Sequence, residues 1–268
     1  MGKNNRKNSL LWRIEGKDGP LPSFVFGTIH VKADFAFENL EPVLNAMDQC
    51  AAFAAELSLE EAAQHVNLAS AALANSQNHL PTVLPAQKYE KIRKLLKRAT
   101  KVDINHLAHL RPMLLMNTMD ELFMPSGGQA EALDTYLWNL AKKKNKAVFG
   151  LETVQSQAAV MQNMDPKEEV SAFLQQAKNI SQSRQQIRKT IHWYRDGNIW
   201  QLYRSSHRSL GKWRNVLLTK RNFIMTERIM DINAEQTVFA AVGAAHLAGK
   251  YGVLALLKRQ GYRVTPLI

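Results

Sequence analysis

A short apolar segment followed by Gly-x-x-His occurs twice in this chain, once near each end. The first runs from Phe24 through Gly27 to His30, and the second runs from Val238 through Gly243 to His246. A buried strand that ends in glycine places the next side chains at its carboxyl end, where α/β proteins build their sites. One copy alone is a weak signal, because a strand-end turn with a structural histidine has the same pattern. Two copies predict that His30 and His246 converge on one site.

The residues that follow each histidine strengthen the internal repeat. Residues 40–50 after His30 favour a helix, and the apolar run 51–55 then ends in Glu56. Residues 251–259 after His246 favour a second helix, with a strand expected over 262–265. The predicted fold class is therefore α/β (α+β). Two strand–GxxH–helix–strand halves, residues 9–57 and 236–268, form a mixed sheet, with a large helical insertion over 58–235.

The middle of the chain has mainly helical periodicity. We expect helices over 87–100, 105–123 and 130–144, and a third strand-like run that ends in Gly150-Leu151-Glu152. No linker rich in Pro, Gly or Ser forces a division, so we expect one domain over 1–268. The basic residues 1–8 are expected to be a disordered tail.

Composition excludes several classes of protein. A single cysteine, Cys50, rules out an intrachain disulfide and a cysteine-based zinc finger. No run of 18 apolar residues occurs, so no membrane-spanning helix is expected. The formal net charge of +12 favours polyanions or anionic lipid surfaces as partners, although such charge often serves only solubility.

Four strand ends offer groups that bind metals or transfer protons. They present His30, Glu56, Glu152 and His246. Two imidazoles and a carboxylate suit zinc, manganese, iron or cobalt and leave positions open for water. A second carboxylate can act as general base. The chain has neither the G-x-S-x-G of α/β-hydrolases nor a complete phosphate-binding loop.

Residues 184–214 are strongly basic and contain five interleaved aromatic residues. Cations with aromatic residues between them suit single-stranded nucleic acid or an anionic membrane surface. The alternative is an amphipathic helical pair with its aromatic rings packed inward, and we favour it. The region's cations are Arg184, Arg188, Lys189, Arg195, Arg204, Arg208, Lys212 and Arg214, and its aromatic residues are Trp193, Tyr194, Trp200, Tyr203 and Trp213.

These motifs together resemble the TraB/PrgY/GumN family, which includes the Tiki metalloproteases. The resemblance covers residues 10–268. It is carried by Gly27-Thr28-Ile29-His30, the apolar run into Glu56, Gly150-Leu151-Glu152-Thr153, Arg221-Asn222 and Gly243-Ala244-Ala245-His246-Leu247. Asp134 resembles the family's aspartate before Gly-Leu-Glu, although Leu133 replaces the usual preceding glycine.

The resemblance implies metal-dependent hydrolysis of peptides or protein N-terminal segments, with manganese or cobalt favoured and zinc as an alternative. It implies that His30 and His246 bind the metal and that Glu56 is a ligand or the general base. Glu152 would orient one of them or supply the remaining carboxylate. Arg221 and Asn222 match the family's polar pair, and Arg221 would hold a substrate carboxylate or the developing oxyanion.

We therefore expect a metal-dependent peptidase. The alternative is a non-catalytic protein that sequesters a peptide signal in the same cleft, as in pheromone shutdown by PrgY-like relatives. The expected partner is a peptide or protein, with an anionic membrane surface as a second partner of residues 184–214 and nucleic acid disfavoured. Many bacterial members of the family are exported or lipid-anchored, so an extracytoplasmic location is expected, with the cytoplasm as the alternative. The sequence does not indicate an oligomeric state.

Overall fold

The computed structural model describes residues 8–16, 22–64, 79–125, 127–162 and 164–267. The expected tail over 1–8 therefore lies outside the described residues except for its last position. The chain divides into two compact units. Unit 1 comprises residues 1–61, 126–153 and 190–268, and unit 2 comprises 62–125 and 154–189.

Unit 1 is built on a six-stranded mixed sheet with the order β4-β3-β5-β2-β1-β6. The strands β4, β3, β5 and β2 are parallel to one another, whereas β1 is antiparallel to both β2 and β6. A mixed sheet combined with many helices confirms the predicted α/β class. The strands are β1 (Leu11–Glu15), β2 (Ser23–Thr28), β3 (Ala52–Leu57), β4 (Ala147–Glu152), β5 (Val238–Gly243) and β6 (Arg263–Pro266).

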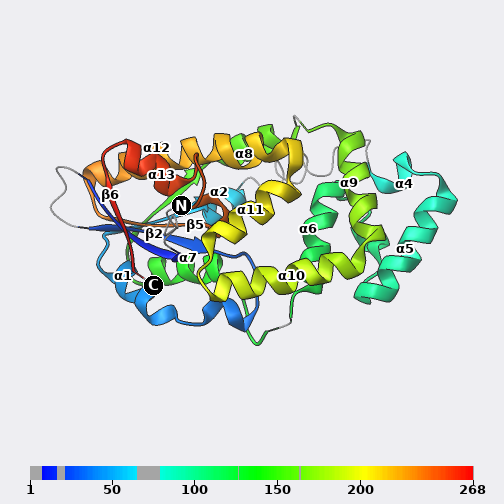
Figure 1. Cartoon of the computed structure of the whole chain (residues 1–268), viewed down its shortest axis with the longest axis horizontal. Helices are drawn as coiled ribbons and strands as arrows, with labels where there is room; N and C mark the ends of the chain where they lie inside the picture. Colours follow the sequence, from blue (N-terminus) through cyan, green and yellow to red (C-terminus); the bar gives the residue numbers. More distant parts are fainter. Residues whose placement is uncertain (1–7, 17–21, 65–78, 126, 163, 268) are drawn as a thin grey trace, which may run out of the picture. The chain divides into compact units, whose positions relative to one another are not determined.

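Helices cover both faces of this sheet, which explains why its central strands are continuously apolar. On one face, Val25, Ala54 and Ala240 pack with residues of α12 (Arg221–Glu235) and α13 (Val253–Arg259). On the other face, the Phe53 ring stacks on Phe239 and meets Trp138 of α7 (Leu133–Lys143) edge-on. Within unit 1, Figure 1 shows α12 and α13 on the side of the sheet opposite α1 (Leu40–Asp48) and α7.

Shorter elements connect the strands and helices of unit 1. A π-helix, η4, leads directly into α12, and a 3-10 turn, η5, follows β5. Single π turns are often found at functional sites, because they shift the register of the side chains that follow. These elements are η1 (Asp34–Phe37), α2 (Leu59–Gln64), which begins in this unit, α11 (Ile199–Ser209), η3 (Gly211–Trp213), η4 (Asn215–Lys220) and η5 (Ala244–His246).

The described part of unit 2 is helical. Its core is formed by apolar residues that include Leu96, Leu115 and Phe173. The prediction of one helix over 105–123 is wrong: a 3-10 turn is followed by a separate helix that begins at Pro112, because proline cannot continue a helix but fits its first position. The elements are α4 (Leu80–Val83), α5 (Ala86–Thr100), η2 (Ile104–Leu107), α6 (Pro112–Phe123), α8 (Val154–Gln162), α9 (Pro166–Lys178) and the first part of α10 (Ile180–Arg195).

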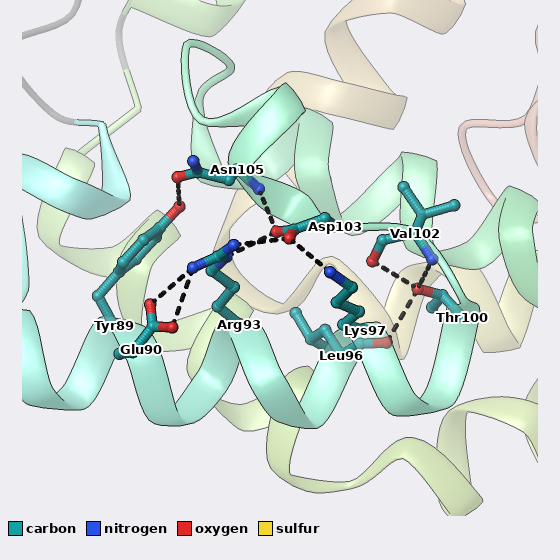
Figure 2. Close-up of polar contacts among 9 residues, drawn as sticks. All are labelled: Tyr89, Glu90, Arg93, Leu96, Lys97, Thr100, Val102, Asp103 and Asn105. Carbon is teal, nitrogen blue, oxygen red and sulfur yellow. Dashed lines mark hydrogen bonds and ion pairs between the residues drawn. The ribbon is translucent and has the colours of Figure 1, made fainter.

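Two ion-pair systems stabilise unit 2. Arg93 on α5 donates Nε and Nη2 to the two carboxylate oxygens of Asp103, both at 2.7 Å, and Lys97 donates to the same carboxylate at 3.1 Å (Figure 2). Asp103 also accepts from the Asn105 backbone N–H, so the network holds the turn after α5. Separately, the buried side chains of Arg111 and Glu169 pair in a bidentate contact between the starts of α6 and α9.

Candidate active site

The predicted strand ends lie at one edge of the sheet, because β2, β5, β3 and β4 are parallel neighbours. Glu56 is the second-last residue of β3, and Glu152 is the last residue of β4. The end of β2 is paired in register with that of β5, Thr28 opposite Gly243. His246 ends the turn η5 after β5.

The two glycines that precede the histidines allow close packing at this edge. A Cβ atom on Gly27 would lie 2.7 Å from the Leu247 side chain and 3.1 Å from the Ala244 backbone. A Cβ atom on Gly243 would lie 3.1 Å from a carboxylate oxygen of Glu56. The glycines therefore permit the close approach of one GxxH segment to the other and of Glu56 to the turn.

One guanidinium group joins the two acids. Arg221, at the start of α12, donates Nε to both oxygens of Glu152, at 3.1 and 2.8 Å. Its Nη2 donates to Glu152 and to Glu56, each at 2.6 Å. The Glu152 side chain is fully buried and that of Arg221 is 15% exposed. Arg221 thus neutralises a pair of carboxylates, and its Nε and Nη2 donors are used within the protein rather than on a ligand.

Glu56 is held as an anion. Burial acts to raise its pKa, but the positive charge of His246 in its protonated form, Arg221 and the Gly243 N–H donor at 2.7 Å together lower the pKa of Glu56 to about 2. For the same reason the pKa of Arg221 lies above its usual range, because the attraction of Glu56 and Glu152 outweighs burial. A carboxylate of such low basicity is suited to binding a cation and poorly suited to accepting a proton at neutral pH.

His246 is held neutral, with a defined tautomer. Its Nδ1 lies 2.6 Å from Asn222 Oδ1, while Asn222 Nδ2 donates to the Tyr251 carbonyl at 2.7 Å. Because the amide oxygen only accepts, Nδ1 carries the proton and Nε2 carries the lone pair. Burial lowers the pKa of His246 to about 4. Nε2 lies 3.8 Å from Glu56 Oε1.

His30 has the same orienting device but lies outside this group. Its Nδ1 is 2.5 Å from Oδ2 of Asp134, in the first turn of α7, and the His30 side chain is 67% exposed. The other Asp134 oxygen, Oδ1, is buried and has no hydrogen-bond partner among the residues that the structure describes. The sequence named Asp134 only through the family resemblance, and no periodicity or spacing would have paired it with His30.

The donor set fits a divalent ion in its chemistry, and its members Glu56 and His246 lie close to each other. Two ligands at about 2.1 Å from one ion are about 3–3.5 Å apart, close to the 3.8 Å between His246 Nε2 and Glu56 Oε1. Both histidines also use Nδ1 for an acceptor, which is how metal-binding histidines are usually oriented. Over the described ranges, however, no three His, Cys, Asp or Glu side chains form a metal-binding group.

The basic region over 184–214 has its aromatic side chains directed mainly inward. Tyr194 is buried and its hydroxyl donates to the Gly27 carbonyl at 3.0 Å. Trp200 and Tyr203 pack against the core cluster of unit 1. The region's lysine and arginine side chains are exposed. This pattern matches the inward-packed helical pair rather than a row of rings open for base stacking.

The fold and this edge of the sheet define an α/β protein with a carboxylate–guanidinium–imidazole site at the ends of parallel strands. The TraB/PrgY/gumN family model matches residues 10–266, and the chain belongs to that family. The chain is 26% identical to Metalloprotease TIKI1 of Danio rerio and of Xenopus tropicalis, over 96% and 98% of its own length. It is 23% identical to a Metalloprotease TIKI homolog of Nematostella vectensis over 96% of its length.

The chain spans 63%, 62% and 66% of these three relatives. No solved structure matches it. Among the described residues, no helix is long and apolar enough to cross a membrane.

Proposed function

We propose that this chain is a metal-dependent peptidase whose site lies at the carboxyl ends of β2, β3, β4 and β5. The observation that carries the proposal is the Glu56–His246 pair. Glu56 is kept anionic, His246 is kept neutral, and the Nε2 lone pair of His246 faces the carboxylate. The metalloprotease names of relatives along nearly the whole chain support the same class of activity.

In this proposal Glu56 and His246 hold a divalent ion, manganese or cobalt before zinc, and His30 is the candidate third ligand. The ion would supply Lewis acidity for attack on a peptide carbonyl. Asn222 and Asp134 fix which nitrogen of each imidazole carries the proton. Arg221 orients Glu56, and Glu152 holds Arg221 in place. The role of general base, which the resemblance left open for Glu56, is disfavoured by its low pKa.

The test is metal content by mass spectrometry after chelation and reloading with manganese, cobalt or zinc. We expect near-stoichiometric metal in the wild type and in His192→Ala, which removes an exposed surface histidine, and little in a His246→Ala/Glu56→Gln variant. The wild type and His192→Ala should hydrolyse peptide, and the His246→Ala/Glu56→Gln variant should not. Absence of metal from the wild type would refute the proposal. Bound metal with peptide recovered intact would favour the signal-sequestering alternative.

An extracytoplasmic location and an anionic membrane surface as a partner of residues 184–214 remain predictions.

A further inference from the structure

Three large apolar side chains are exposed beside the candidate active site. We call Phe223, Ile224 and Tyr251 the aromatic patch. Their exposed fractions are 49%, 42% and 39%, and the Phe223 and Tyr251 ring centroids are 6.0 Å apart. Single exposed apolar residues are ordinary, but a group of them next to a site marks a surface that another molecule covers.

The fold of unit 1 does not require these side chains. The buried residues of α12 are Asn222, Met225, Thr226, Ile229 and Ile232. Phe223 and Ile224 fall between them in sequence and are both exposed. The start of α12 therefore has two different faces. The side chains of Arg221 and Asn222 point inward to the site, and those of Phe223 and Ile224 point outward.

Two cations lie over the Tyr251 ring of the aromatic patch. Lys250 Nζ lies 5.2 Å from the centre of the Tyr251 ring, and the Arg259 guanidinium carbon lies 5.5 Å from it. Lys220, which ends the π-helix before α12, is also exposed. Glu227, one turn after Phe223, is the exposed acid of the same helix nearest to it in sequence. An acidic group beside an apolar one is thus the chemistry that this surface complements.

A single side chain links the aromatic patch to the site. Asn222 accepts from His246 with its oxygen and donates to the Tyr251 carbonyl with its nitrogen. The segment that carries Tyr251 is closely packed: Gly249 has a φ of +99°, and a Cβ atom on Gly252 would lie 2.3 Å from the Ala248 carbonyl oxygen. The Tyr251 backbone is therefore tied to the same side chain that orients His246.

From these contacts we propose that the aromatic patch is a docking surface for the peptide substrate, and that it takes an apolar or aromatic side chain with an acidic residue next to it. This inference rests on the proposed peptidase function, because it assigns the substrate class of the same site. A peptide is favoured over a membrane because the patch adjoins the site through one side chain and consists of only three exposed residues.

The test measures peptide binding separately from cleavage. The probes are three fluorescein-labelled Gly/Ser decapeptides that carry Phe-Glu, Ser-Glu or Phe-Lys at their centre, and the assay is fluorescence anisotropy on the whole chain. We expect the Phe-Glu peptide to bind about tenfold more tightly than either counterpart, as for one well-placed aromatic anchor. In Phe223→Ser and in Phe223→Ser/Tyr251→Ser the preference for the Phe-Glu peptide over the Ser-Glu peptide should disappear. Leu95→Ser, which removes an apolar side chain that is 41% exposed in unit 2, should retain it.

Equal binding of all three peptides, or an unchanged preference in both patch variants, would overturn the inference. So would co-sedimentation of the wild type with phosphatidylglycerol vesicles that both patch variants lose, without any peptide preference, since the patch would then be a membrane surface. A peptide preference without metal binding or cleavage would support the docking surface and refute the peptidase instead. Circular dichroism of each variant checks that the fold is retained.

Discussion

Replacing Arg221 with methionine should destabilise unit 1 strongly, and more so at neutral than at acidic pH. The substitution keeps much of the aliphatic volume but leaves Glu56 and Glu152 facing each other without their shared cation. Removing one partner of a buried ion pair costs about 3–5 kcal/mol, so we expect a loss of that size at pH 7.

The pH dependence distinguishes this mechanism from a simple packing defect. In the wild type, the contribution of Glu56 is present above pH 4.5 and is lost as the pH falls toward 2. His246 must be neutral when folded, so its contribution is lost as the pH falls from 6.5 toward 4. In Arg221→Met, Glu56 loses its neighbouring cation and gains a proton more readily, and acidification then relieves its repulsion with Glu152. The stability difference should therefore shrink by about 2 kcal/mol between pH 7 and pH 4.5.

Urea unfolding of the metal-free protein, followed by tryptophan fluorescence, measures this difference. All five tryptophans, at positions 12, 138, 193, 200 and 213, belong to unit 1, so the signal reports that unit. Arg195→Met is the matched control, because Arg195 pairs with Glu38 at the exposed surface, where an ion pair contributes little to stability. A loss below 1 kcal/mol for Arg221→Met at pH 7, or a loss independent of pH, would refute the reasoning.

Further predictions concern packing and reactivity. Glu169→Gln should destabilise unit 2 by about 3–5 kcal/mol, measured by circular dichroism, because Arg111 would stay buried without its counter-charge; a change under 1 kcal/mol would contradict this. Gly252→Ala should lower the melting temperature, since its Cβ atom would overlap a backbone carbonyl, whereas Gly128→Ala, with nothing closer than 3.9 Å, should not. Burial raises the pKa of Cys50 to about 12, so its thiol should react with a disulfide reagent only after unfolding; rapid labelling of the folded protein would show otherwise.

The sequence predicted that these strand ends lie together at one edge of the sheet, because strand ends leave a local signature. An apolar run followed by glycine and a titratable residue is visible at Glu152, His30 and His246, and parallel pairing then places these ends together. The family resemblance named Arg221 and Asn222 but not their contacts. That Arg221 neutralises two acids, and that Asn222 orients His246, depends on how α12 packs against the ends of the strands.

Other features had no sequence signal strong enough to predict them. The exposed position of His30 beside Asp134 depends on how the segment after β2 meets the first turn of α7, which no periodicity encodes. Pro112 did signal a helix start, but the continuous apolar pattern on both sides of it favoured one long helix. The separation of unit 2 from unit 1 could not be predicted, because the chain passes between them without linkers of distinctive composition.

The position of β5 in the sheet has a consequence for biosynthesis. This strand begins only at Val238, yet it lies between β3 and β2 and pairs with both. Until the ribosome has released it, the facing edges of β2 and β3 have no backbone partner in the native arrangement, and unpaired apolar edges are aggregation-prone. The sheet of unit 1 can therefore close only late in synthesis, and we expect the nascent chain to depend on chaperones until β5 has emerged.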